Sequence, residues 1–221
     1  MISHDPPPPL CAVSEQTFTG VREWLEARAA DRTTPLVVGI GGPGGCGKST
    51  LSRWLYHRMD DAEILSLDDF RLPREDRKKH GRYGSHPLGN DVDRLERVLE
   101  EAKAGRQVMQ PVFDLEHGRV LEEIPLQPAR LILADGEIAA HDHLRPHFDH
   151  LILVDAHWRT QLNTRLTRDL QERHCSLEKA IDIFLQSNLR DYPTYAKGAR
   201  EEADVLLYRT VKHVFTRKRM P

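Results

Sequence analysis

The chain has 221 residues and a formal net charge of −2, and this length suits one α/β domain with a sizeable core. The near-neutral charge argues against a nucleic-acid partner, and no apolar run approaches the ~20 residues of a membrane span. The three cysteines include no Cys-x-x-Cys pair, and residues 1–10 lack the basic start and apolar run of a signal peptide. We therefore expect a reduced, cytoplasmic protein with no membrane partner.

The first part of the chain combines a proline-rich segment, a helix and a strand. Residues 1–13 include four consecutive prolines, which predict a flexible N-terminal tail. An amphipathic helix is expected next, and its apolar face comprises Phe18, Val21, Leu25 and Ala29. Residues 36–40 form a short β-rich apolar run, which indicates a buried strand.

Residues 42–49 fit the phosphate-loop pattern Gly-x-x-x-x-Gly-Lys-Ser/Thr, and they lie between that strand and a run with helical apolar spacing. This context disfavours a chance glycine-rich turn. Glycines let backbone N–H groups turn inward around a phosphate, and the N-terminus of the following helix favours negative charge. Lys48 is expected to reach the β- and γ-phosphates, and Ser49 to bind Mg²⁺ through its hydroxyl. The predicted nucleotide-binding residues are Gly42, Gly44, Gly45, Cys46, Gly47, Lys48, Ser49 and Thr50.

The rest of the chain alternates apolar strands with helices. After a strand at residues 62–67, the basic and unperiodic residues 72–89 predict a loop that acts on a ligand. Further along we expect, in order, a helix from Asn90 or Asp91 to Gly105, a β-excursion at 108–124, and buried strands at 131–134, 150–154 and 203–208. This alternation predicts an α/β fold with a doubly wound parallel sheet and a ligand at the carboxyl ends of its strands.

Two helices are predicted between the last two of these strands. The first is expected from about Trp158, and its inward-pointing residues are predicted to be Leu162, Leu166 and Leu170. The second is expected from Ser176, with only half of a capping box because Lys179 replaces Glu or Gln.

The first of these helices carries a group of arginines. Arg165 and Arg168 lie three residues apart and share one side of it, and Arg173 follows at its end. Such guanidinium groups suit the transfer of a charged phosphoryl group. The alternative is a solvated helix with Asp169 and Glu172 as the ionic partners.

Acidic residues follow two of the predicted strands. Asp68 and Asp69 are adjacent in a segment expected to be extended, so their side chains should point to opposite sides and only one can face a site. Asp135 ends another strand, where it could serve Mg²⁺ or cap a helix. A phosphoryl-transfer site needs positioning, Mg²⁺ and one carboxylate near the attacking hydroxyl, and these acids with the phosphate loop could provide them.

In their order along residues 36–208, these motifs resemble the uridine kinase and phosphoribulokinase family of P-loop kinases. The resemblance rests on the phosphate loop, residues 65–70, His86-Pro87, residues 111–114 with His117 and Arg119, Asp135-Gly136, residues 148–155, residues 164–169 with Glu172-Arg173, and residues 203–205. It implies a P-loop kinase fold with a five-stranded parallel core, a small β-excursion and a helical lid at about 158–176. We accordingly expect a single kinase domain at residues 14–210 and a basic tail at residues 211–221.

The resemblance also implies roles for individual residues. Asp68 would be the general base for the acceptor hydroxyl, and the other catalytic residues would be Lys48, Arg168 and Arg173. Ser49 and Asp135 would bind Mg²⁺. The acceptor would be bound by Asp69, Ser85, His86, Phe113, His117, Arg119 and Arg165.

Several positions depart from the uridine kinase pattern. The departures are Ser85 in place of an Asp before His-Pro, Phe113 in place of Tyr, Asp135 in place of Glu, and Cys175 in place of a further lid arginine. Residues 87–93 are similar instead to the Pro-x-x-Asn-Asp-x-Asp stretch of phosphoribulokinases. Because Ser85 carries no charge, nucleoside binding should be weak unless a nearby acid such as Asp91 or Asp93 replaces the missing carboxylate.

The sequence therefore predicts an ATP- and Mg²⁺-dependent kinase that phosphorylates a hydroxyl of a small metabolite. A nucleoside such as uridine is the first expectation, and a sugar or sugar phosphate is the alternative. A protein that binds nucleotide with little turnover also stays open, whereas a GTPase switch is disfavoured because the chain has no Asn-Lys-x-Asp segment. The small-molecule acceptor is the partner that the sequence predicts, and homo-oligomerisation is left open.

Overall fold

The computed structural model describes residues 5–221, so residues 1–4 of the predicted flexible tail lie outside the described residues. Its central sheet has the strand order β2-β5-β1-β6-β7-β8. Five of these strands are parallel: β2 (Ala62–Ser66), β5 (Leu131–Asp135), β1 (Leu36–Gly41), β6 (His150–Ala156) and β7 (Val205–Arg209). The predicted five-stranded parallel core is therefore confirmed.

The sixth strand lies in the segment that we expected to be a basic tail. β8 (Phe215–Arg219) pairs antiparallel with β7, and only 2% of Phe215 is exposed. The Phe215 ring packs against that of Phe18 in the first helix, with ring centroids 4.8 Å apart. The predicted tail at residues 211–221 is wrong, because one buried aromatic side chain holds a strand whose remaining residues are mostly charged.

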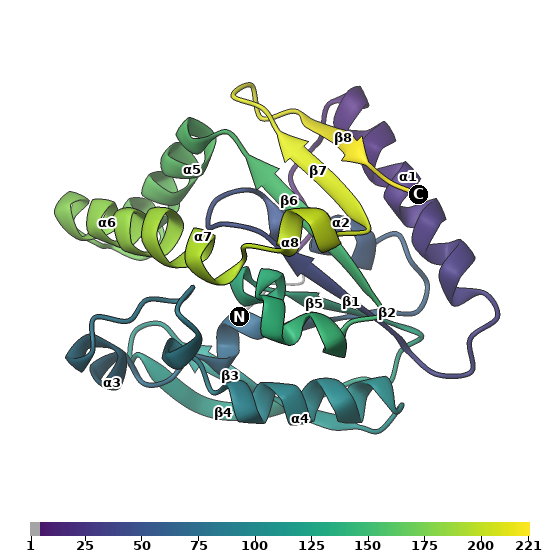
Figure 1. Ribbon diagram of the computed structural model, residues 1–221, viewed down its shortest axis with the longest axis horizontal. Coiled ribbons are helices and arrows are strands. Elements are labelled where there is room, and N and C mark those ends of the chain that lie inside the picture. Colours follow the sequence, from purple (N-terminus) through teal and green to yellow (C-terminus); the bar gives the residue numbers. More distant parts are fainter. Residues whose placement is uncertain (1–4) are drawn as a thin grey trace.

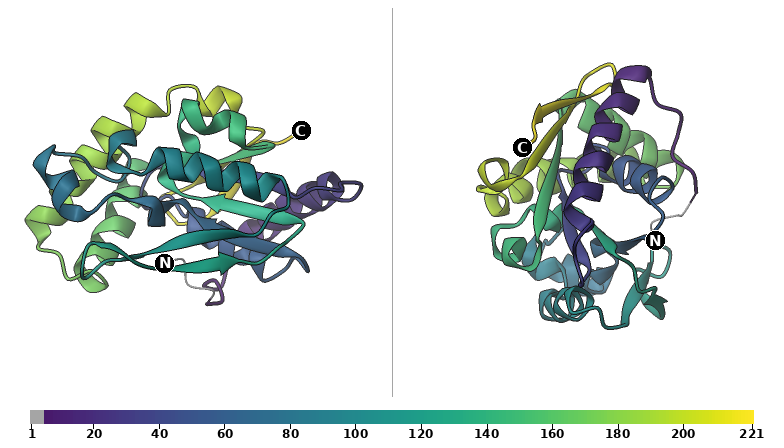
Figure 2. Two further views of the ribbon diagram at one scale, coloured as in Figure 1. Left: turned by 90° about the horizontal axis from the view of Figure 1, so that it is seen from below. Right: turned by 90° about the vertical axis from the view of Figure 1, so that its right-hand side faces the viewer.

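Helices cover both faces of the sheet. The side chains of β1 alternate, so that Leu36, Val38 and Ile40 face one core and Val37 faces another. The first core includes α1 (Ala12–Ala29) and α2 (Lys48–Tyr56), and the second includes α4 (Val92–Lys103). Figures 1 and 2 show α1 and α4 well apart, as the doubly wound arrangement requires.

The predicted β-excursion is a hairpin of β3 (Val108–Asp114) and β4 (Arg119–Leu126). It packs against η1 (Leu67–Phe70), the 3₁₀ turn that follows β2. Two short elements interrupt the predicted ligand loop, α3 (Arg74–Lys79) and η2 (Pro87–Gly89). After β5, the chain forms two more 3₁₀ turns, η3 (Glu137–Ala140) and η4 (Asp142–His147).

A helical layer follows β6 and lies on the side toward which the arrowheads of β1 and β6 point (Figure 1). It consists of α5 (Trp158–Gln171), α6 (Leu177–Ile183), the π-helical η5 (Phe184–Asp191) and α7 (Tyr192–Tyr195), and α8 (Ala199–Glu202) then leads into β7. None of the helices within residues 5–221 combines the length and apolar character that a bilayer span needs.

The inner face of α5 is polar. Its buried residues are Thr160, Gln161, Arg165 and Asp169. Leu162 and Leu166 are only partly buried and line an apolar groove with α6 and η5, and Leu170 is 37% exposed. The prediction that these leucines point inward is wrong, because α5 lies over the phosphate loop, where a charged environment replaces the apolar core.

Candidate active site

The phosphate loop lies between β1 and α2, at the carboxyl end of a central strand. Gly42, Gly45 and Gly47 have φ values of +146°, +80° and +108°, in the region that favours glycine. A Cβ on Gly44 would lie 1.9 Å from Nη1 of Arg165, so a side chain there would displace this arginine. Cys46 is fully buried, and burial raises the pKa of its thiol to about 11. The loop thus presents the close-approaching backbone that phosphate binding requires.

Lys48 begins α2 and reaches back across this loop. Its Nζ donates hydrogen bonds to the carbonyl oxygens of Gly42 at 2.9 Å and Pro43 at 3.2 Å, and 8% of the residue is exposed. Burial opposes the positive charge, but nearby acidic groups, Glu137 and Asp135 among them, raise the pKa of Lys48 above its ordinary value. The ammonium group therefore stays charged, and phosphate oxygens could replace its two carbonyl partners.

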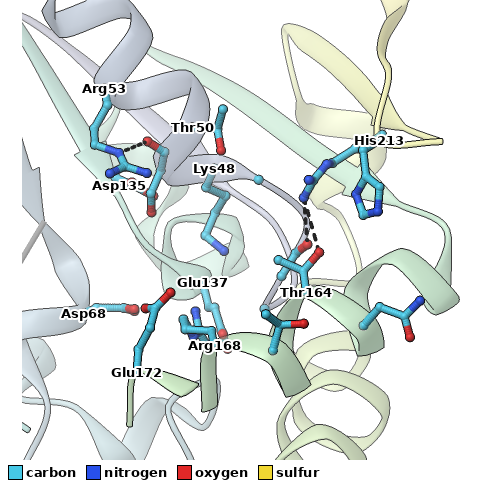
Figure 3. A pocket seen from close by; sticks show the side chains of 17 residues that line it. Lys48, Thr50, Arg53, Asp68, Asp135, Glu137, Thr164, Arg168, Glu172 and His213 are labelled. Atoms are coloured by element: carbon cyan, nitrogen blue, oxygen red, sulfur yellow. Dashed lines mark hydrogen bonds between the residues drawn. The ribbon is translucent and has the colours of Figure 1, made fainter. Parts of the chain in front are cut away.

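A cavity of about 510 Å³ opens beside the loop. In Figure 3 the ammonium end of Lys48 points into it toward Glu137 and Arg168, and Asp68 and Glu172 enter from another side. The residues of the predicted site that line the cavity are Gly44, Gly45, Gly47, Lys48, Ser49, Thr50, Asp68, Asp135 and Arg168. The structure therefore brings the phosphate loop, two acids and one lid arginine together.

Asp135 ends β5 with its carboxyl group almost fully buried, at 2% exposure. Its Oδ2 has no hydrogen-bond partner within residues 5–221. Burial raises the pKa of Asp135 to about 6, while Lys48 and the hydroxyls of Ser49 and Ser52 act in the opposite direction. Mg²⁺ prefers oxygen ligands, and a carboxylate with one unpartnered oxygen beside a serine hydroxyl is a chemically suitable donor set for it.

Asp68 and Asp69 lie in the 3₁₀ turn η1 and not in the extended segment that we predicted, because the chain turns directly after β2. The side chains of Asp68 and Asp69 nevertheless point into different environments. Asp68 lines the cavity and forms an ion pair with Nη2 of Arg71 at 2.5 Å. Asp69 is 5% exposed and accepts a hydrogen bond from the backbone N–H of Phe113 at 3.2 Å. Asp68 is the acid of this pair that can meet an acceptor hydroxyl, and Asp69 attaches η1 to the hairpin.

Glu137 is a functional candidate that the sequence analysis missed. It lies in η3, is 6% exposed and lines the cavity. Its carboxylate accepts hydrogen bonds from the hydroxyls of Ser85 and Ser187 and forms an ion pair with Nη1 of Arg165 at 3.1 Å. Burial opposes the charge, but Arg165, Lys48 and the hydrogen bond from Ser85 together outweigh this effect, and the pKa of Glu137 lies well below its ordinary value. A second acid two residues beyond the end of a strand is the signal that could have identified it.

Ser85 is fully buried against this carboxylate. The acid beside it is therefore Glu137, and the two acids considered from the sequence lie elsewhere. Asp91 caps α4 by accepting a hydrogen bond from the backbone N–H of Arg94 at 3.2 Å, and Asp93 lies in the first turn of the same helix. The negative charge that Ser85 lacks is therefore carried by Glu137 of η3.

Three predicted arginines of the lid share one buried carboxylate. Oδ2 of Asp169 lies 3.6 Å from Nε of Arg165, and its Oδ1 lies 3.2 Å from Nε of Arg168 and 3.3 Å from Nη1 of Arg173. Asp169 is 0% exposed. Burial and repulsion from neighbouring arginines lower the pKa of Arg173 to about 10. The alternative of a solvated helix is therefore wrong for this face, which gathers positive charge beside the phosphate loop.

The remaining predicted acceptor-binding residues do not line the cavity. His86 lies 3.0 Å from the hydroxyl oxygen of Tyr195 in α7, measured from its Nε2. Phe113 is buried in β3, whereas His117 and Arg119 are exposed, one in the hairpin turn and the other at the start of β4. The structure thus gathers the phosphate-donor half of the predicted site and leaves these acceptor residues along the loop and the hairpin.

Several cavity residues were not predicted as site residues. They are Arg53, Asn163, Thr164, Thr167, Glu172, Arg209 and His213, in addition to Glu137. Arg209, at the end of β7, donates hydrogen bonds to the carbonyl oxygen of Gly45 at 3.5 Å and to Oγ1 of Thr164 at 3.4 Å. No local pattern reveals the contact between Arg209 and Thr164, because they are 45 residues apart in the sequence.

The family profile described as "Phosphoribulokinase / Uridine kinase family" matches residues 37–215. The chain belongs to this family. It is 28% identical over 183 residues to a uridine kinase of Bacillus velezensis, which covers 79% of this chain and 86% of that relative. It is also 27% identical over 178 residues to a phosphoribulokinase of Synechocystis sp., but the match covers 78% of this chain and only 53% of that longer relative.

A solved structure with a similar fold is D-glycerate 3-kinase from Cryptococcus neoformans, with a TM-score of 0.68 and 17% identity over 94% of this chain and 99% of that one. At this identity the likeness concerns the fold alone. Together, the family match and the observed sheet confirm the resemblance and the P-loop kinase fold that the sequence predicted. This family member is accordingly a nucleotide-binding kinase of small metabolites, as its relatives are.

Proposed function

We propose that the protein transfers the γ-phosphate of ATP to a hydroxyl group of a small metabolite, with Mg²⁺ bound at the phosphate-loop end of the cavity. The observation that carries this proposal is that Lys48, Asp68 and Asp135, whose Oδ2 is buried without a hydrogen-bond partner among the described residues, line one cavity. Phosphoryl transfer requires a cation for the phosphates, an acid for the acceptor hydroxyl and a ligand for a divalent ion, and these three residues can supply them.

In the proposed reaction, the acceptor oxygen bonds to the γ-phosphorus as the bond from that phosphorus to the bridging oxygen of ADP breaks. The proton of the acceptor hydroxyl passes to Asp68. Lys48 and Arg168 stabilise the charge on the transferring phosphoryl group. Ser49 and Asp135 would hold Mg²⁺, which would supply further charge neutralisation at the phosphates. Closure of the α5–α6 lid would exclude water and so limit hydrolysis of ATP.

Two acceptor classes are suggested by the relatives. One relative is a uridine kinase, which agrees with our first expectation, and another is a phosphoribulokinase, whose acceptor is a sugar phosphate. A nucleoside would need a free carboxylate near position 85 for its ribose hydroxyls. Glu137 is the acid at that place, and its carboxylate is already engaged by Ser85, Ser187 and Arg165. This arrangement supports an acceptor whose recognition does not depend on a free carboxylate near position 85.

An ADP-release assay with and without acceptor tests the proposed reaction. Suitable acceptors are uridine, ribulose 5-phosphate and D-glycerate. We expect ADP release to depend on an acceptor and to fall at least about a hundredfold in Lys48→Ala. Lys103→Ala is the matched control, since this lysine forms an ion pair with Asp149 outside the cavity and its loss should leave turnover unchanged. ATP loss that needs no acceptor and survives Lys48→Ala would contradict the proposed function.

A further inference from the structure

An arginine is ion-paired to the acid that the proposed reaction uses as its base. Nη2 of Arg71 lies 2.5 Å from Oδ2 of Asp68, and the two side chains are 13% and 39% exposed. Burial raises the pKa of Asp68, but Arg71 and Lys48 outweigh this effect and lower it. A carboxylate that is stabilised by a guanidinium is a poorer proton acceptor. Asp68 therefore becomes a better base when its ion pair with Arg71 is broken.

The guanidinium of Arg71 lies against the loop at residues 72–89. The Arg71 backbone forms an isolated β-bridge with Asn90, whose side-chain amide donates hydrogen bonds to the carbonyl oxygens of Gly84 and His86 at 3.0 Å each. Gly84 faces the guanidinium so closely that a Cβ there would lie 3.4 Å from Nε of Arg71. Arg71 is thus held beside Asp68 by the predicted ligand loop.

Two further arginines bring excess positive charge to this place. Arg77 of α3 donates a hydrogen bond to the backbone carbonyl oxygen of Leu72 at 2.9 Å, and Arg173 shares Asp169 with two other arginines. The pKa values of Arg77 and Arg173 are both lowered to about 10, first by burial and then by repulsion from neighbouring arginines that include Arg71. An anion bound here would relieve that repulsion.

Given the proposed kinase function, on which this inference rests, we propose that the acceptor is a small hydroxylated anion whose phosphate or carboxylate group binds Arg71. A guanidinium can hold an oxyanion through two parallel hydrogen bonds, so this group can replace the carboxylate of Asp68 as the partner of Arg71. The acceptor then frees the base that its own hydroxyl needs. Water carries no anionic group, so it does not release Asp68 in this way.

Binding of inorganic phosphate to the protein loaded with Mg²⁺ and AMPPNP tests this site. Because the ATP analogue occupies the nucleotide-binding site, inorganic phosphate can bind only on the acceptor side of the site. We expect calorimetry to detect phosphate binding and Arg71→Met to weaken it about ten- to hundredfold, as expected for the loss of one charge-assisted contact. Arg71→Lys should recover part of this affinity, which a folding defect would not do. Arg106→Met, which removes an arginine from an exposed ion pair with Glu101, should bind phosphate normally.

Two outcomes of that experiment would overturn the inference. One is equal phosphate affinity in the unaltered protein and in Arg71→Met, and the other is no phosphate binding by the unaltered AMPPNP-loaded protein. Failure to bind AMPPNP at all would count against the proposed kinase function instead. The two hypotheses can therefore fail separately.

Matched acceptors distinguish the anionic group from the rest of the molecule. D-glycerate and glycerol differ by a carboxylate, and ribulose 5-phosphate and ribulose differ by a phosphate. We expect kcat/KM for one anionic acceptor to exceed that of its neutral counterpart at least about tenfold. In Arg71→Met, the KM of that acceptor should rise while the KM of ATP stays within about twofold. Turnover of glycerol, ribulose or uridine as efficient as that of the anions would refute the anion requirement and leave the kinase function standing.

Discussion

Replacing Glu137 by glutamine should lower the stability of the protein substantially. The carboxylate of Glu137 neutralises Arg165 at 3.1 Å and accepts hydrogen bonds from Ser85 and Ser187. Glutamine keeps the shape but leaves Arg165, which is 5% exposed, dependent on Asp169 at 3.6 Å for neutralisation. Breaking a buried ion pair from one side costs about 3–5 kcal/mol. Each kcal/mol shifts the Tm of a chain of this length by about 2–4 °C, so we expect a fall of about 6–20 °C.

Thermal denaturation followed by circular dichroism measures this fall, with Glu101→Gln as the matched control. Glu101 pairs with Arg106 at the surface, where solvent screens the ion pair and its loss should cost little stability. Because folding lowers the pKa of Glu137, its contribution is complete above its ordinary pKa of about 4.3 and is lost as the pH falls below that value. The Tm difference should therefore be constant near neutral pH and shrink in acid. A fall no larger than that of Glu101→Gln would refute the reasoning.

Asp68→Asn should lower kcat by about 10²- to 10⁴-fold and leave the KM of ATP similar, because only the proton acceptor is lost. Asp69→Asn should mainly lower the Tm, and a larger kinetic effect for Asp69 than for Asp68 would reverse the assignment. Asp135→Asn should raise the Tm at about pH 7.5 in EDTA, because folding raises the pKa of this acid to about 6 and its ionised form is destabilising above that pH. The gain should disappear by about pH 4, and a loss of Tm at both pH values would contradict the assignment of a buried carboxylate whose ionised form is destabilising. Ser85→Asp should lower the Tm because it buries a second carboxylate against Glu137, and an improved KM for uridine in this variant would show that the pocket is open after all.

The order of strands and helices was predictable because each element has a local pattern. The parallel strands are short apolar runs, and the phosphate loop is one contiguous segment after β1. β8 was missed because residues 215–219 contain a single apolar side chain. That strand depends on the free edge of β7 and on the contact between Phe215 and Phe18, neither of which a local pattern contains.

The phosphate-donor half of the site was predictable for the same reason, and the rest was not. Glu137 is held in the site by hydrogen bonds from Ser85 and Ser187. These serines lie 52 and 50 residues away in the sequence, so no local pattern shows the contacts. The leucine spacing of α5 predicted the wrong inner face, because hydrophobic periodicity cannot show that the neighbouring surface is charged. Arg165 and Asp169 face inward there because each has an ionic partner.

Transfer of an isotopic label from ATP to the acceptor would decide whether the cavity performs the proposed reaction. The protein would be incubated with Mg²⁺, ATP labelled with ¹⁸O in the γ-phosphoryl group, and each acceptor in turn. Mass spectrometry would then measure the masses of the products. We expect one acceptor to gain the labelled phosphoryl group with the unaltered protein, and to gain none with Lys48→Ala or Asp68→Asn. Labelled inorganic phosphate without any labelled acceptor, formed equally by the unaltered protein and both variants, would contradict a kinase site built on Lys48 and Asp68.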